Sequence, residues 1–281
     1  MEDSFIRIDP RSLQSRLTIP CIIFYALAAL CGAVGIGLMF SGKYTQVLLQ
    51  DMALSGITNP ASQQTWMGVN RAVTLLSCLC PAIMATGLLL SRGNHPLRGM
   101  GLLSRAAQGM LWFVRISGGC ACIVFVYRFF RYIAIYLSHP SGLMAIYSMV
   151  ISEALMGAQA AFLFVMICRH LNVCIDSAAS ITYTLATSRL DSRSIPGFAA
   201  TGFLILSIVG IALACNRMFT VTIVVNVVRS YYKLLVSSHP GLILESLCLV
   251  LGSAANFMMY RILKKYKQQT ERKLFEARFG I

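Results

Sequence analysis

A single acidic side chain, Glu153, lies inside a long apolar run, where it follows Met149, Val150, Ile151 and Ser152. A carboxyl group near the middle of a membrane-spanning helix costs roughly 2.5–3.5 kcal/mol on insertion scales, so it usually faces a cavity or a partner. Two roles remain open for Glu153: contact with a proton or a solute, or an interhelix hydrogen bond that holds a bundle together. The natural candidate partner is Arg115 in the preceding apolar run, although Arg115 could instead extend toward the near end of its helix.

Cationic residues also follow the apolar runs at 106–127 and 198–215. Arg128 and Arg131 share a helical face, and Arg229 and Lys233 lie four residues apart on another. Such faces either reach the phosphate headgroups of lipids or form a cationic vestibule that attracts anionic ligands.

The C-terminal tail is strongly basic and is expected to form an amphipathic helix. Basic clusters beside a membrane span bind anionic lipid at about 1 kcal/mol per residue. The tail therefore predicts a lipid-binding segment, with docking onto a cytoplasmic partner protein as the alternative. The residues concerned are Lys264, Lys265, Lys267, Arg272 and Lys273.

Signatures of other chemistry are missing from the sequence. It contains no HExxH, GxSxG or P-loop motif, and its aspartates all lie in tails or loops, so no enzymatic activity and no cofactor are predicted. His139 and His239 each precede a proline that can start a helix, which accounts for them without a metal. The ten cysteines lie in or beside apolar runs with no CxxC spacing, which favours packing over metal or disulfide roles.

The composition indicates that these residues belong to a membrane protein. The chain is 57% hydrophobic and only 12% charged, whereas soluble domains are about 25% charged. Continuous apolar runs of this length predict helices that span a membrane. The net charge of +14 then fits anionic lipid better than nucleic acid. The predicted fold is all-α, a polytopic bundle of six transmembrane helices: 19–40, 66–90, 106–127, 142–168, 198–215 and 242–260.

A turn of Ser-His-Pro occurs twice, at Ser138 and at Ser238, and Asn59-Pro60 takes a similar place earlier in the chain. We interpret these turns as linkers inside three tandem two-helix units, a repeat of fixed period. In the first unit, Ala29, Ala33 and Gly37 form a small-residue face suited to close packing. The units cover residues 12–91, 101–170 and 191–262, with a cytoplasmic loop at 171–193 and the basic tail at 262–281.

The basic residues predict the orientation. Sixteen of the 24 Lys and Arg residues lie on the side that holds both termini, and seven lie on the other side. This excess predicts a multi-pass protein of the plasma membrane with both termini in the cytoplasm. The segment 218–236 is expected to be an outer amphipathic helix, with a seventh span as the alternative.

The predicted function is that of a small permease that moves or binds a small solute, because the repeat, the Gly and Pro breaks and Glu153 are typical of translocation paths. The alternative is a non-catalytic membrane subunit that anchors or senses for a membrane or cytoplasmic partner. The expected contacts are the bilayer, anionic headgroups and a partner protein or second copy of the chain, without nucleic acid.

Overall fold

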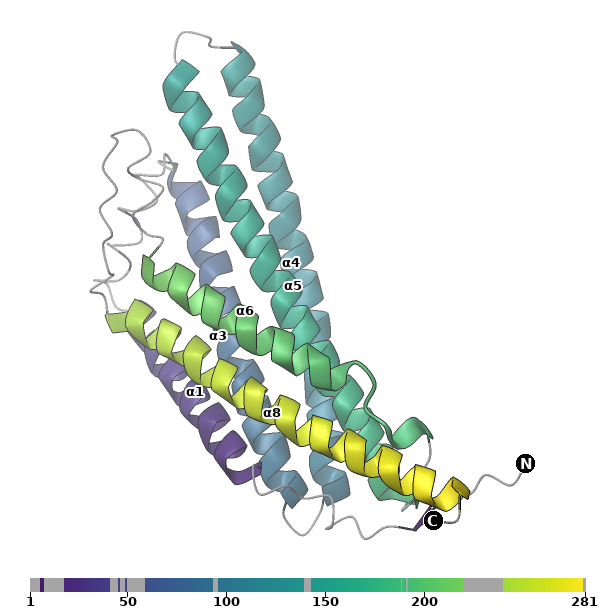
Figure 1. Ribbon diagram of the computed structural model, residues 1–281. Helices are drawn as coiled ribbons and strands as arrows, with labels where there is room; N and C mark the ends of the chain where they lie inside the picture. The colour runs from purple at the N-terminus through teal and green to yellow at the C-terminus, as the bar shows by residue number, and fades with distance from the viewer. Residues whose placement is uncertain are drawn as a thin grey trace.

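A computed structural model of the chain describes residues 6–7, 18–40, 45, 49, 59–92, 96–138, 143–187, 189–190, 192–219 and 240–279. This part of the chain is helical apart from one antiparallel pair of two-residue strands, as the all-α prediction requires (Figure 1). The elements are β1 (Ile6–Arg7), α1 (Thr18–Met39), α3 (Pro60–Arg92), α4 (Pro96–Ser138), α5 (Leu143–Thr187), β2 (Arg189–Leu190), the 3-10 helix η3 (Ser192–Ser194), α6 (Ala199–Phe219) and α8 (Pro240–Phe279).

The long helices pack mainly against their neighbours in the sequence. The pairs α1–α3, α4–α5 and α6–α8 are all in contact, and α1 also packs along α8, so the first and last helices close the bundle. The helices α4 and α5 project beyond the others at one end of the molecule (Figure 1). At the other end, the base, β1 pairs with β2 and contacts α8.

Three helices are long and apolar enough to cross a membrane. Among the described residues these spans are Thr18–Leu38, Phe164–Thr187 and Ile243–Glu276, and two shorter apolar helices run over Cys78–Arg92 and Ala200–Cys215. The outer face of α1 shows what such a span presents to its surroundings. Five large apolar side chains are exposed there at a spacing of three or four residues: Ile19, Ile23, Leu27, Leu30 and Val34. A continuous apolar stripe of this kind suits contact with lipid and favours association with a membrane.

Proline starts α3 and α8. Pro60 opens α3, six residues before the predicted start of that helix at 66, and the Asn59 side chain caps it by accepting a hydrogen bond from the Ala61 N–H at 3.0 Å. Pro240, the last residue of the second Ser-His-Pro turn, opens α8. His139, His239 and residues 220–236 lie outside the described part of the chain.

Two predicted helix boundaries were wrong. The third span was expected to begin at residue 106, but α4 begins at Pro96, and Met100 and Leu103 are buried. The segment 171–193 was expected to be a cytoplasmic loop, but α5 continues to Thr187. In that extension Leu171, Cys174 and Ala178 are buried at a helical spacing. Polar residues on the opposite face made a packed helix look like a loop, because charge alone does not end a helix.

The small-residue face predicted on α1 is displaced by one position. Gly37 has open space beside it and Ala33 is exposed, whereas Ala28, Gly32 and Gly35 are buried. A Cβ atom at Gly32 would collide with the Cys78 side chain of α3 and would lie 3.1 Å from the Cys248 Sγ of α8. At Gly32, α1 therefore lies directly against both α3 and α8.

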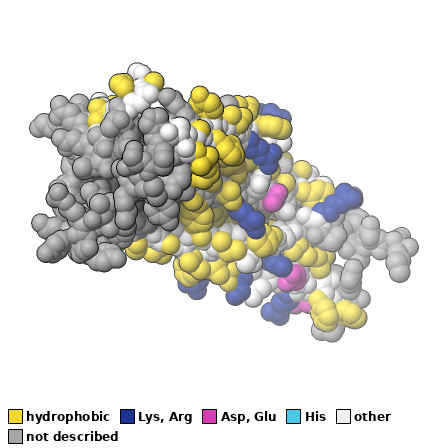
Figure 2. All heavy atoms as spheres, turned by 90° about the horizontal axis from the view of Figure 1, so that it is seen from above, with side chains coloured by type: hydrophobic (Ala, Val, Ile, Leu, Met, Phe, Trp, Pro, Cys, Tyr) yellow, Lys and Arg dark blue, Asp and Glu magenta, His cyan; other side chains and the backbone are white. Residues whose placement is uncertain are grey.

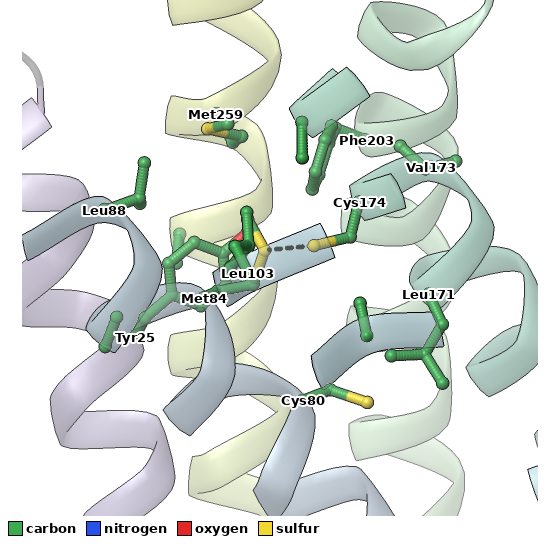
Figure 3. Packing of buried hydrophobic residues seen from close by; sticks show 14 of the residues in the cluster. Tyr25, Cys80, Met84, Leu88, Leu103, Leu171, Val173, Cys174, Phe203 and Met259 are labelled. Carbon is green, nitrogen blue, oxygen red and sulfur yellow. Dashed lines mark hydrogen bonds between the residues drawn. The ribbon is translucent and has the colours of Figure 1, made fainter. Parts of the chain in front are cut away.

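The core lies where six helices meet: α1, α3, α4, α5, α6 and α8 (Figure 3). Met84 of α3 occupies its centre, and the Cys174 Sγ of α5 lies 3.1 Å from the Met84 sulfur. Tyr25, Leu171 and Phe203 are fully buried around this contact. Such a mixture of sulfur, aromatic and aliphatic side chains fills an irregular space between helices that cross at different angles.

Candidate functional site

A pocket of about 50 Å³ lies in the bundle between α1, α3, α5, α6 and α8. This volume has room for a few water molecules or one small solute. The pocket wall is mostly apolar and includes Pro81, Gly210 and Gly252. Its polar side chains are Tyr25, His170, Ser253 and Asn256.

A buried hydrogen bond crosses this pocket between the first and last helices. The Tyr25 hydroxyl donates to the Asn256 Oδ1 at 2.6 Å, and both residues line the pocket. Neighbouring Ser253 turns its hydroxyl back to the Leu249 carbonyl at 2.7 Å. Since polar groups buried without a partner are costly, these bonds make a polar wall stable inside an apolar bundle.

Of the four polar residues that line the pocket, His170 has a buried side-chain nitrogen without a hydrogen-bond partner among the described residues. It lies on α5, its exposed fraction is 8%, and its ring packs edge-on against Phe203 with centroids 6.1 Å apart. Within the described residues, its Nε2 atom is buried and has no hydrogen-bond partner. An unpaired buried nitrogen of this kind costs roughly 1–3 kcal/mol, a cost that a bound water or solute would offset.

Sulfur atoms surround the pocket without forming a metal site. Cys80 and Cys248 line it, and both are free thiols. In the part of the chain that the structure describes, no group of three or more His, Cys, Asp or Glu residues is arranged to hold a metal ion. The arrangement can therefore offer hydrogen bonds and apolar contact to a ligand, with no described carboxylate, Lys or Arg in the pocket wall.

The structure does not bring Glu153 and Arg115 together. Gly118 of α4 lies directly against Phe164 of α5, and these two consecutive helices are antiparallel. Arg115 lies three residues from that contact toward the base, and Glu153 lies eleven residues from it toward the projecting end. At 1.5 Å per residue the two are roughly 20 Å apart along the helices, too far for an ion pair.

Arg115 has a different partner. It is exposed, and its guanidinium carbon lies 5.7 Å from the centroid of the Trp112 ring, one turn nearer the base of α4. This is the geometry of a side chain that extends toward the end of its helix. Glu153 lies on α5, and its side chain is outside the described part of the chain, so its role stays a prediction.

The predicted outer cationic face falls mostly outside what the structure describes. Arg128 and Arg131 lie on α4, which continues without a break to Ser138, but their side chains are not among those described. Arg229 and Lys233 lie wholly outside the described residues.

The basic residues of the tail lie on the last part of α8, which is helical to Phe279. Lys264 and Lys265 are exposed, and Lys273 is half-buried. Lys267 forms an ion pair with Glu271 at 3.8 Å, and Arg272 with Glu276 at 2.7 Å, each four residues apart. Leu263, Tyr266 and Thr270 are buried, and the Tyr266 and Thr184 hydroxyls lie 3.0 Å apart. Lys264, Lys265 and Arg272 lie on the exposed side of this helix, whereas Lys267 and Lys273 lie beside its buried face and are half-buried.

Sequence reasoning missed the pocket residues. His170 follows Arg169 directly, so the pair resembled the polar end of a span, and Tyr25 and Asn256 lie 231 residues apart. The available signal was spacing: along α5, His170 falls one turn before the buried Cys174, on the same face as Ile167.

The chain matches no protein-family model, no curated protein and no solved structure.

Proposed function

We propose that the protein is a multi-pass plasma-membrane permease that binds a small uncharged solute in the pocket beside His170 and lets it cross the bilayer. The observation that carries this proposal is the buried, unpartnered Nε2 of His170 in a residue that lines the pocket. Small-molecule sites are commonly apolar cavities with a few polar groups that fix orientation.

The chemistry of the wall supports an uncharged ligand. The pocket wall offers the phenol, hydroxyl and amide of Tyr25, Ser253 and Asn256, and the imidazole of His170. Moving a full charge into such a wall would leave that charge without an opposite partner, which is costly. A solute with one or two hydrogen-bonding groups on a short carbon frame fits best.

The helices around the pocket support a path across the membrane. Gly210 allows α6 to lie directly against Ser253 of α8, and Pro81 removes one backbone hydrogen bond of α3. Interrupted or closely packed helices of this kind occur at substrate sites in transporters. The proposal includes six spans in three two-helix units, with both termini in the cytoplasm, which agrees with the packing of α1 on α3, α4 on α5 and α6 on α8.

Solute flux in proteoliposomes tests this proposal. Vesicles with the purified protein are mixed rapidly with glycerol, urea or acetamide, and their swelling is followed by light scattering. We expect at least one solute to enter faster than in protein-free vesicles, and His170→Phe, which keeps a ring but removes both nitrogens, to abolish the difference. Asp176→Asn is the matched control, because Asp176 is exposed on the same helix. No acceleration for any small uncharged solute would exclude the permease function.

The second candidate is a non-catalytic membrane subunit. It is favoured by the folded base, where α5, α8 and the β1–β2 pair form a continuous surface bearing ion pairs. Native mass spectrometry of the gently extracted protein separates the two: a partner at fixed stoichiometry, together with no solute flux, supports the subunit function.

A further inference from the structure

Two cations meet aromatic rings where α5, α6 and α8 approach the base. The guanidinium carbon of Arg169 on α5 lies 4.8 Å from the ring centroid of Phe198, just before α6. The ammonium of Lys264 on α8 lies 5.7 Å from the ring centroid of Tyr260. Stacking on a ring holds each side chain in one direction while its charge stays accessible.

These two pairs lie at the same level of the bundle. Gly210 of α6 lies against Ser253 of α8, and the helices run in opposite directions (Figure 1). Phe198 lies twelve residues before Gly210, and Lys264 lies eleven residues after Ser253. At 1.5 Å per residue, both are roughly 17 Å from the contact on its basal side.

Lys264 also faces α6. Eleven residues make slightly more than three helical turns, so Lys264 lies on the same face of α8 as Ser253, which contacts α6. Similarly, Phe198 lies one turn before Gly202, which contacts Val173 of α5. Arg169 on α5 and Lys264 on α8 therefore both lie near the start of α6.

This level divides an apolar surface from a charged one. On the side away from the base, the exposed side chains of α6 and α8 are apolar, and on the basal side the end of α8 is covered with charges. Figure 2 shows hydrophobic side chains over the middle of one face and charged side chains toward the end where α8 finishes. The apolar residues are Ile205, Ile208, Leu247, Val250 and Phe257.

We propose that Arg169 and Lys264, held by Phe198 and Tyr260, bind the phosphate group of an anionic phospholipid in the leaflet nearest the base. Aromatic rings and basic side chains gather at the headgroup level of membrane proteins. Among the described residues, no carboxylate forms an ion pair with either cation. The lipid phosphate supplies the missing negative charge, and the acyl chains follow the apolar surface beside α6.

Retention of lipid by the purified protein tests this site. The protein is extracted from membranes containing phosphatidylglycerol and phosphatidylcholine, and bound lipid is counted by native mass spectrometry. A basic residue near the membrane surface contributes about 1 kcal/mol, or about fivefold in affinity. The double change Arg169→Gln/Lys264→Gln should therefore reduce phosphatidylglycerol retention about thirtyfold and leave phosphatidylcholine unchanged.

Lys265→Gln is the matched control, because it removes the same charge from the next residue, which points about 100° away. Equal loss with Lys265→Gln would show general attraction to a basic surface and would overturn the site, as would unchanged retention in the double variant. Inorganic phosphate at millimolar concentration should not displace the lipid. If it does, the site binds a free anion instead.

Discussion

The two halves of α8 differ in their outer face while sharing the same inner one. From Pro240 to Tyr260 the helix buries Cys248, Ser253 and Asn256 against α1 and α6, and its exposed residues are apolar. From Arg261 to Phe279 it buries Leu263, Tyr266 and Thr270, and most of its exposed residues are polar or charged. The buried face of α8 thus determines which helices it packs against, and the exposed face shows whether lipid or water surrounds it.

The largest effect is expected from a charge placed on the apolar outer face. Leu247→Arg should reduce membrane insertion of the α8 segment by about 3 kcal/mol, because arginine is costly at the centre of a span. The fraction inserted can be measured by glycosylation mapping in microsomes. Gln268→Arg, the same new charge on the basal half, should change it by less than about 0.5 kcal/mol. A similar cost at both positions would show that the two halves share one environment.

A smaller effect is expected at Gly32, where α1 lies directly against α3 and the apolar half of α8. Gly32→Val should destabilise the protein by about 1–3 kcal/mol, because the new side chain would collide with Cys78 and crowd Cys248. The free energy of unfolding can be measured by titration with a denaturing detergent. Gly37→Val, five residues along the same helix and beside open space, is the control and should change little. An equal loss of stability in both variants would show that Gly32 does not face α3 and α8.

The last two variants compare two buried hydroxyl bonds, one from Tyr25 to the apolar half of α8 and one between Tyr266 on its basal half and Thr184 of α5. Tyr25→Phe leaves the Asn256 Oδ1 without its donor inside the bundle and should cost about 1–3 kcal/mol. Tyr266→Phe should cost only about 0.5–1 kcal/mol, because the Thr184 hydroxyl keeps its bond to the Ser180 carbonyl at 3.0 Å. The same detergent titration checks both variants. A larger loss of stability for Tyr266→Phe than for Tyr25→Phe would contradict this order.

Sequence patterns predicted where helices begin more reliably than where they end. Proline fixes a start through local geometry, so Pro240 was informative, whereas Pro60 was placed in a linker and instead opens α3. Arg169 and Asp176 suggested a loop, yet α5 passes through both, because exposed charges are compatible with a helix whose other face is buried.

The pocket could not be predicted from any one segment. Five helices contribute to its wall, and its polar contact joins residues at opposite ends of the chain. A lone charge inside an apolar run, such as Glu153, is visible in a sequence. A lone His beside an Arg, such as His170, is not, until the helices show which of the two is buried.

The hydrogen bond from Tyr25 to Asn256 also has a consequence for biosynthesis. The two residues are separated by 231 positions, so at about 5–20 residues per second α1 is made roughly 10–50 s before its partner exists. During that interval the closing face of α1, with its hydroxyl, is open in the membrane. The newly made helix must therefore be sheltered by the insertion machinery or by α3 until the last helix arrives. Synthesis that stops before α8 would leave an open bundle for quality control to recognise.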